Sequence, residues 1–94
     1  MNIFNSKGKV LQVKAFHPGL FLQEEIEERK LLKKDVAQQL GILPTNLSEI
    51  MNGKRNISPK LAVKLEKALG VSAEYWLNLQ MAWDLQNARE EELV

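Results

Sequence analysis

Cysteine is absent from this chain of 94 residues, and histidine occurs once, as His17. The lack of cysteine excludes disulfide bonds and thiolate metal sites, and it suits a cytoplasmic protein. One histidine without cysteine can assemble neither a metal site nor a nucleophile with its base, and no glycine-rich phosphate loop is present. We therefore expect no catalytic residue, metal, cofactor or small-molecule substrate, and we expect His17 to shape the start of a helix.

Long hydrophobic runs are also missing, because no uninterrupted apolar run exceeds four residues. A helix that spans a bilayer needs about 20 such residues, and the N-terminus lacks the apolar segment of a signal peptide. We expect a soluble protein without membrane association. Its length fits one domain with a modest core and no deep substrate cleft.

The net charge of +1 conceals an uneven distribution along the chain. Residues 30–67 carry eight lysines and arginines against three acidic residues, whereas residues 20–29 and 73–94 carry net charges of −3 and −4. A basic segment between acidic flanks indicates a surface that faces a polyanion. Lys60, Lys64 and Lys67 are the exception, because we expect them only to solvate their helix.

Apolar residues at helical spacing, bounded by start and stop signals, predict five helices and an all-α domain. Pro18, Pro44 and Pro59 each suit the first turn of a helix, and Gly41 and Gly70 suit left-handed helix ends. The predicted helices cover about residues 18–29, 33–40, 44–51, 59–69 and 73–89, with Asn52 and Gly53 ending the third. Residues 1–16 form either a short strand or a loose arm, so we divide the chain into this arm and a helical domain at 17–94.

The stretch KKDVAQQLGILPTNLSEIMNG, residues 33–53, contains two short helices joined by a glycine-containing turn. This spacing predicts a helix-turn-helix over about residues 33–52. The small Ala37 lets the helices approach closely, and apolar side chains bury the seam between them: Val36, Leu40, Leu47 and Ile50. The outward positions of the second helix are polar and of moderate length, as in a helix that enters a major groove: Thr45, Asn46, Ser48 and Glu49.

Residues 22–76 resemble the lambda-repressor-like, XRE-type helix-turn-helix domain, with NGKR directly after the second helix and LAVKLEKALGVS after that. HPG at 17–19 and AEYWLNLQ at 73–80 narrow the resemblance to the HigA/VapI antitoxin family. The resemblance extends from residue 17 to about residue 88. It implies a five-helix lambda-repressor-like DNA-binding domain with a short N-terminal arm.

The same resemblance implies a repressor that binds operator DNA near its own gene and neutralises a HigB/RelE-like mRNA-cleaving toxin. Pro44, Thr45 and Glu49 match positions where such repressors read base edges, and three cationic residues match positions that contact phosphates. These roles suit the side chains, because cations neutralise phosphates while threonine and glutamate can bond base edges. The predicted DNA-binding residues are Lys33, Pro44, Thr45, Asn46, Ser48, Glu49, Lys54 and Arg55.

The chain departs from the family pattern at the starts of two helices. The family usually has serine or threonine before the second and third helices, where this chain has Leu32 and Leu43. Loss of a polar cap costs about 0.5 to 2 kcal/mol, and Pro44 removes a backbone N–H that could meet DNA. A protein-binding inhibitor with weak DNA affinity therefore stays open as an alternative. A second alternative, independent of these departures, is a stand-alone XRE-family regulator without a toxin, which the neighbouring reading frame would distinguish.

The last predicted helix, about 73–89, has apolar residues on two sides. One side carries Tyr75, Trp76, Leu79, Ala82 and Trp83, and the other carries Leu77, Met81, Leu85 and Ala88, with Gln80 on a polar edge between them. A monomer of this size covers only one side, so the second side predicts a homodimer interface at Leu77, Met81, Leu85 and Ala88. A two-fold dimer would place its recognition helices on half-sites about 34 Å apart. The alternative is that the N-terminal arm folds over this side.

Overall fold

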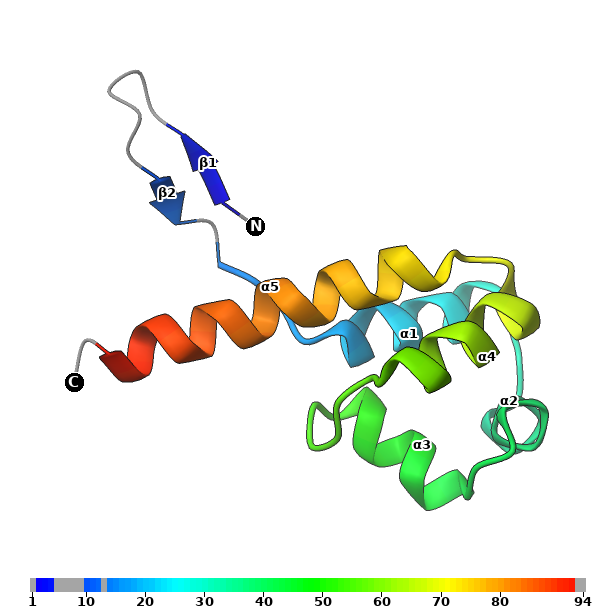
Figure 1. The fold of residues 1–94 in the computed structure, drawn as a ribbon. Coiled ribbons are helices and arrows are strands. Elements are labelled where there is room, and N and C mark those ends of the chain that lie inside the picture. Colours follow the sequence, from blue (N-terminus) through cyan, green and yellow to red (C-terminus); the bar gives the residue numbers. More distant parts are fainter. Residues whose placement is uncertain (1, 5–9, 13, 93–94) are drawn as a thin grey trace.

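The computed structural model describes residues 2–4, 10–12 and 14–92, and these residues contain five helices (Figure 1). The helices are α1 (Pro18–Glu28), α2 (Lys33–Leu40), α3 (Pro44–Met51), α4 (Pro59–Leu69) and α5 (Ala73–Glu92). The predicted five-helix architecture is confirmed, and α2, α3 and α4 have the predicted ends. Helix α1 ends one residue earlier than predicted and α5 ends three residues later. In the part of the chain that the structure describes, no helix is both long and apolar enough to cross a membrane.

Two short strands precede the helices, β1 (Asn2–Phe4) and β2 (Val10–Gln12). They pair antiparallel, with Asn2 opposite Gln12 and Phe4 opposite Val10. Of the two alternatives for the arm, the structure contains strands, and it contains two of them because each supplies the backbone partners that the other needs. The strand pair projects away from the helices in Figure 1. Residues 1, 5–9 and 13 of the predicted arm lie outside the described residues.

Side-chain caps fix the starts of three helices. The Nδ1 atom of His17 accepts a hydrogen bond from the Gly19 N–H at 2.9 Å, so His17 does shape the start of α1. Ser58 and Ser72 cap α4 and α5 through their Oγ atoms, at 3.2 and 3.1 Å. By contrast, α2 and α3 begin after leucines and have no side-chain cap hydrogen bond. Two of the five helices therefore start without the stabilisation that a polar cap provides.

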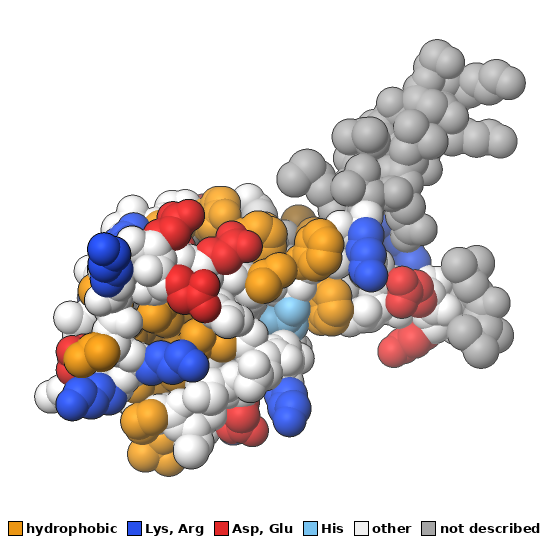
Figure 2. All heavy atoms as spheres, turned by 180° about the vertical axis from the view of Figure 1, so that it is seen from behind, with side chains coloured by type: hydrophobic (Ala, Val, Ile, Leu, Met, Phe, Trp, Pro, Cys, Tyr) orange, Lys and Arg blue, Asp and Glu red, His pale blue; other side chains and the backbone are white. Residues whose placement is uncertain are grey.

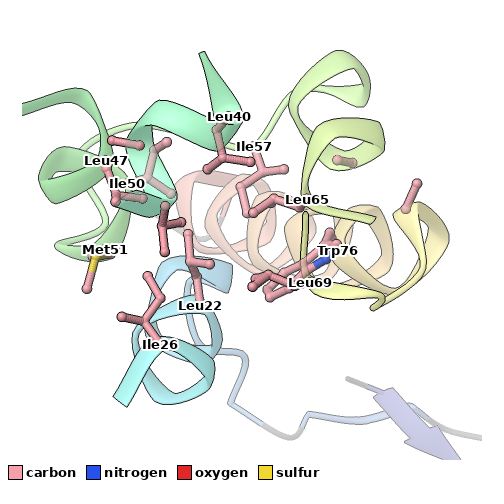
Figure 3. Packing of buried hydrophobic residues seen from close by; sticks show 14 residues of the cluster. Leu22, Ile26, Leu40, Leu47, Ile50, Met51, Ile57, Leu65, Leu69 and Trp76 are labelled. Carbon is pink, nitrogen blue, oxygen red and sulfur yellow. The ribbon is translucent and has the colours of Figure 1, made fainter. Parts of the chain in front are cut away.

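One hydrophobic core joins all five helices, as Figure 3 shows. Leu22 of α1 and Trp76 of α5 are both fully buried in it. The seam of the two short helices is buried as predicted: Val36, Ala37, Leu40, Leu47 and Ile50. Helix α4 buries Ala62, Leu65 and Leu69 in the same core. Helix α3 therefore lies on a closely packed base formed by the other helices.

One prediction about burial is wrong. It does not concern Leu31, which is 39% exposed because α1 ends at Glu28 and Lys30 has a φ of 55° that turns the chain. In α5 the polar edge and the apolar sides are misplaced: Gln80 is buried, whereas Tyr75 is 43% exposed. The side of α5 that faces the core is centred on Trp76 and Gln80, so the two apolar sectors flank it.

Candidate nucleic-acid interface

Helix α3 buries one side and presents the other to solvent. Leu47, Ile50 and Met51 are buried in the core. Pro44 and Thr45 are exposed at the start of the helix, and its other predicted DNA-binding residues are half-buried along its outer side: Asn46, Ser48 and Glu49. The residues predicted to face a groove thus share one polar surface of a short helix.

The turn between α2 and α3 fixes the angle between the two helices. Gly41 ends α2 with a φ of 68°, a left-handed conformation that glycine adopts without steric cost. The Ile42 N–H then donates to the carbonyl of Ala37 at 3.0 Å, so a carbonyl group in the last turn of α2 has a hydrogen-bond partner. Ala37 itself is fully buried, as the close approach of the helices requires.

The start of α1 holds the far end of α3 in place. A Cβ atom at Gly19 would lie 1.8 Å from the carbonyl oxygen of Ile50, so the two backbones are in direct contact there. Next to this contact, the Nε2 atom of His17 lies 3.3 Å from Oδ1 of Asn56, and its ring packs edge-on against Trp83 at 5.6 Å. The His17 side chain therefore connects α1, the loop after α3, and α5.

Two cationic residues follow α3 directly. The Lys54 N–H donates to the carbonyl of Glu49 at 2.8 Å, which folds the chain back beside the helix. Lys54 and Arg55 are exposed, and Nη2 of Arg55 lies 3.1 Å from Oε1 of Glu49. Both side chains of this ion pair are about half exposed, so it contributes only about 0 to 1 kcal/mol to stability. Its main effect is to hold the guanidinium over the outer side of α3.

The contacts of His17 and the Glu49–Arg55 pair are features that sequence reasoning missed. His17 and Asn56 are 39 residues apart in the chain, and Glu49 and Arg55 are 6 apart. Neither is the spacing of neighbours on one helix. A predicted phosphate-contacting residue and a predicted base-reading residue are thus bonded to each other. For His17, the sequence indicated only its role at the start of α1, through the Pro18 and Gly19 that follow it.

Lys33 lies at the start of α2 and is exposed. Figure 1 shows α2 and α3 together at one end of the molecule, and Figure 2 shows lysine and arginine side chains exposed over that end.

Within residues 14–92 and the two strands, no three His, Cys, Asp or Glu side chains gather closely enough to hold a metal ion. The arrangement has the shape and charge to contact a polyanion, with cations at the edges and polar groups at the centre.

Helix α5 leaves part of its second apolar side uncovered. Met81 is 55% exposed and Leu85 is 42% exposed, whereas Leu77 is half-buried against the core. The described segment before α1 also contacts α5, where the backbone N–H of Ala15 donates to Oε1 of Gln86 at 2.6 Å. Since Met81 and Leu85 remain exposed beside this contact, residues 14–17 do not cover them.

Comparisons with known proteins agree with this geometry. A family model described as helix-turn-helix (HTH_3) matches residues 22–76. An uncharacterized HTH-type transcriptional regulator of Escherichia coli K12, YddM, is 36% identical over 73 residues, which are 78% of this chain and 78% of that protein.

Two solved structures have similar folds. The addiction module antidote protein of a HigA family from Coxiella burnetii superposes with a TM-score of 0.77 at 35% identity, over 84% of this chain and 87% of that one. The Pseudomonas aeruginosa antitoxin HigA, solved with the higBA promoter, has a TM-score of 0.77 at 28% identity, over 83% of this chain and 86% of that one. The lambda-repressor-like fold and the HigA-type resemblance are confirmed.

Proposed function

This chain belongs to the helix-turn-helix family that matches residues 22–76, and from that membership we propose that it is a DNA-binding autorepressor and an antitoxin. It binds operator DNA near its own gene as a homodimer, and it neutralises a HigB/RelE-like mRNA-cleaving toxin by binding it. Inhibition by binding suits a chain that offers one histidine and no cysteine for chemistry.

The observation that carries the DNA-binding part is the exposed polar side of α3 between cationic residues. Thr45 lies at the start of this side, where the first residues of a recognition helix meet base edges. Lys33, Lys54 and Arg55 lie at its edges, where they neutralise phosphates and release counterions. Asn46, Ser48 and Glu49 supply further donors and acceptors along the helix.

The antitoxin part is supported by the two HigA-type structures that share this fold, one of them solved with promoter DNA. The homodimer is supported by the exposed side of α5 at Met81 and Leu85, which a second copy would cover. The proposed interface comprises Leu77, Met81, Leu85 and Ala88. The proposed domains are the arm, 1–16, and the helical domain, 17–94, with α5 as the dimerisation helix.

A mobility-shift titration on the DNA upstream of the gene tests the repressor. We expect sequence-selective binding that falls steeply as the salt concentration rises. Arg55→Ala should weaken binding to all sequences alike and lower the salt slope by about 1, whereas Lys67→Ala, which removes a charge from α4, should change neither. No shift on the upstream DNA at any salt concentration would leave only the protein-binding inhibitor.

Co-expression with the adjacent gene, followed by pull-down, tests the antitoxin. We expect the neighbouring reading frame to encode a small basic protein that is retained with this chain and is toxic when expressed alone. If the neighbour encodes no such protein, the chain is a stand-alone regulator.

A further inference from the structure

Leu43 is an apolar side chain in an unusual place. It is 64% exposed, more than any other large hydrophobic side chain among the described residues. It occupies the N-cap position of α3, directly before Pro44 and Thr45, which are also exposed. The tip of the recognition helix is therefore a small apolar patch.

Folding does not explain a leucine at this position. Its side chain makes no cap hydrogen bond, whereas a serine or threonine would accept one from the first turn of α3. It also loses little apolar surface to the core, since most of it remains in water. A residue that neither caps the helix nor packs in the core is free to serve recognition.

The surroundings of Leu43 favour nucleic acid, rather than protein, as the partner that contacts this apolar patch. Leu43 and Pro44 are only two side chains, and Thr45, Lys54 and Arg55 around α3 are polar or cationic. Such a patch is too small for the apolar centre of a protein interface. In the view of Figure 2, hydrophobic side chains reach the surface at the lower tip of the helical body, which is the tip where α3 begins in Figure 1.

The major groove presents one apolar group on its base edges, the C5 methyl group of thymine. We propose that Leu43 packs on a thymine methyl group in each operator half-site and so helps to determine which operator the protein binds. This inference rests on the proposed DNA-binding function. Leu32, also an exposed leucine at an N-cap, lies instead at the start of α2, the helix that crosses the phosphate backbone and meets no base edge.

Deoxyuridine tests the inference, because it differs from thymidine only by the methyl group. The dissociation constant of the full chain is measured for the upstream duplex and for the same duplex with deoxyuridine in place of thymidine. We expect the substitution to raise it roughly four-fold per contacted methyl, which corresponds to about 0.8 kcal/mol. Leu43→Ser should bind the two duplexes equally, and Leu43→Met, which keeps an apolar side chain, should again discriminate between them.

Leu32→Ser is the matched control, because it makes the same change at the other leucine N-cap. We expect it to keep the same discrimination as the unaltered chain, so that any general effect of a better cap or of altered duplex shape is separated from the methyl contact. If Leu43→Ser keeps the discrimination, or if the unaltered chain shows none, the inference is overturned while the proposed repressor stands. If the unaltered chain binds no DNA selectively, both are overturned.

Discussion

At the scale of single residues, Gly19 is the position with the least room. It lies in the first turn of α1 and is buried against the end of α3. Besides the carbonyl oxygen of Ile50, a Cβ atom there would meet Nδ1 of His17 at 3.0 Å. Since these are backbone atoms and the capping ring, none can move aside cheaply. The absence of a side chain at residue 19 thus sets the distance between α1 and the recognition helix.

We predict that Gly19→Ala destabilises the protein and weakens DNA binding together. The added methyl group must push α1 away from α3, and overpacking of this kind typically costs about 1 to 3 kcal/mol. Urea unfolding measures the loss of stability, and a mobility shift measures the loss of DNA affinity that the displacement of α3 should cause. Gly70→Ala is the control: nothing lies within 4 Å of its Cβ, although its φ of 75° strains any side chain. Gly70→Ala should lose stability, but its folded molecules should keep the DNA affinity of the original chain. A Gly19→Ala variant as stable as the original chain would contradict the prediction.

Single residues differ in how far the sequence reveals their roles. Ser58, Gly41 and Gly70 act within a few residues of their own position, so their cap and turn roles were predictable. His17 was predicted to shape the start of α1, and it does. Its contacts with Asn56 and Trp83 were not predictable, because they depend on how distant segments pack.

At the scale of elements, α5 shows where periodicity stops being informative. Its existence and its start were predicted, but the side that faces the core was not. A wheel of hydrophobicity assigns Gln80 to a polar edge, whereas its Oε1 accepts from the Ile57 N–H at 2.7 Å and its Nε2 donates to Asp84 at 2.9 Å. A buried backbone N–H in the loop before α4 required a polar partner, and that need overrode the pattern.

We predict that Gln80→Leu is destabilising even though it adds an apolar side chain to a buried position. The variant leaves the Ile57 N–H without its acceptor, and an unsatisfied buried donor costs about 1 to 3 kcal/mol. Urea unfolding followed by tryptophan fluorescence, from Trp76 and Trp83, gives the measurement. Gln39→Leu is the matched control on an exposed position of α2, where the expected change is within about 0.5 kcal/mol. Equal stabilities of the two variants would show that the Gln80 bond contributes nothing.

The helix-turn-helix was the most predictable element pair, because its turn, spacing and buried seam all lie within residues 33–53. The lengths of helices with clear stop signals were also predicted correctly. Helix α5 continued to Glu92 because no glycine or proline follows its start. The positions of the candidate DNA-binding side chains on the surface were therefore predictable, whereas the Glu49–Arg55 pair was not.

At the scale of the whole molecule, the two proposed interaction surfaces are formed by different elements. The candidate DNA-binding surface belongs to α2, α3 and the loop after it, and the exposed apolar side belongs to α5. Figure 1 shows α5 extending away from the end that carries α2 and α3. Two copies joined through α5 could therefore each keep α3 exposed, which is what binding to two half-sites of one duplex requires.

We predict that Met81→Glu produces monomers in sedimentation velocity. In a two-fold dimer the substitution introduces a carboxylate on both sides of an apolar contact, where burial without a partner is costly. Because Met81 is exposed in the single chain, the variant should fold normally, with a helical circular-dichroism spectrum and a urea midpoint close to those of the original chain. Val63→Glu makes the same change at a 44% exposed apolar residue of α4 and should stay dimeric. The monomer should bind a single half-site weakly and lose the operator affinity that two linked recognition helices provide. If Met81→Glu remains a dimer, the interface lies elsewhere on the surface, and the arrangement of the two recognition helices must be different from the one proposed.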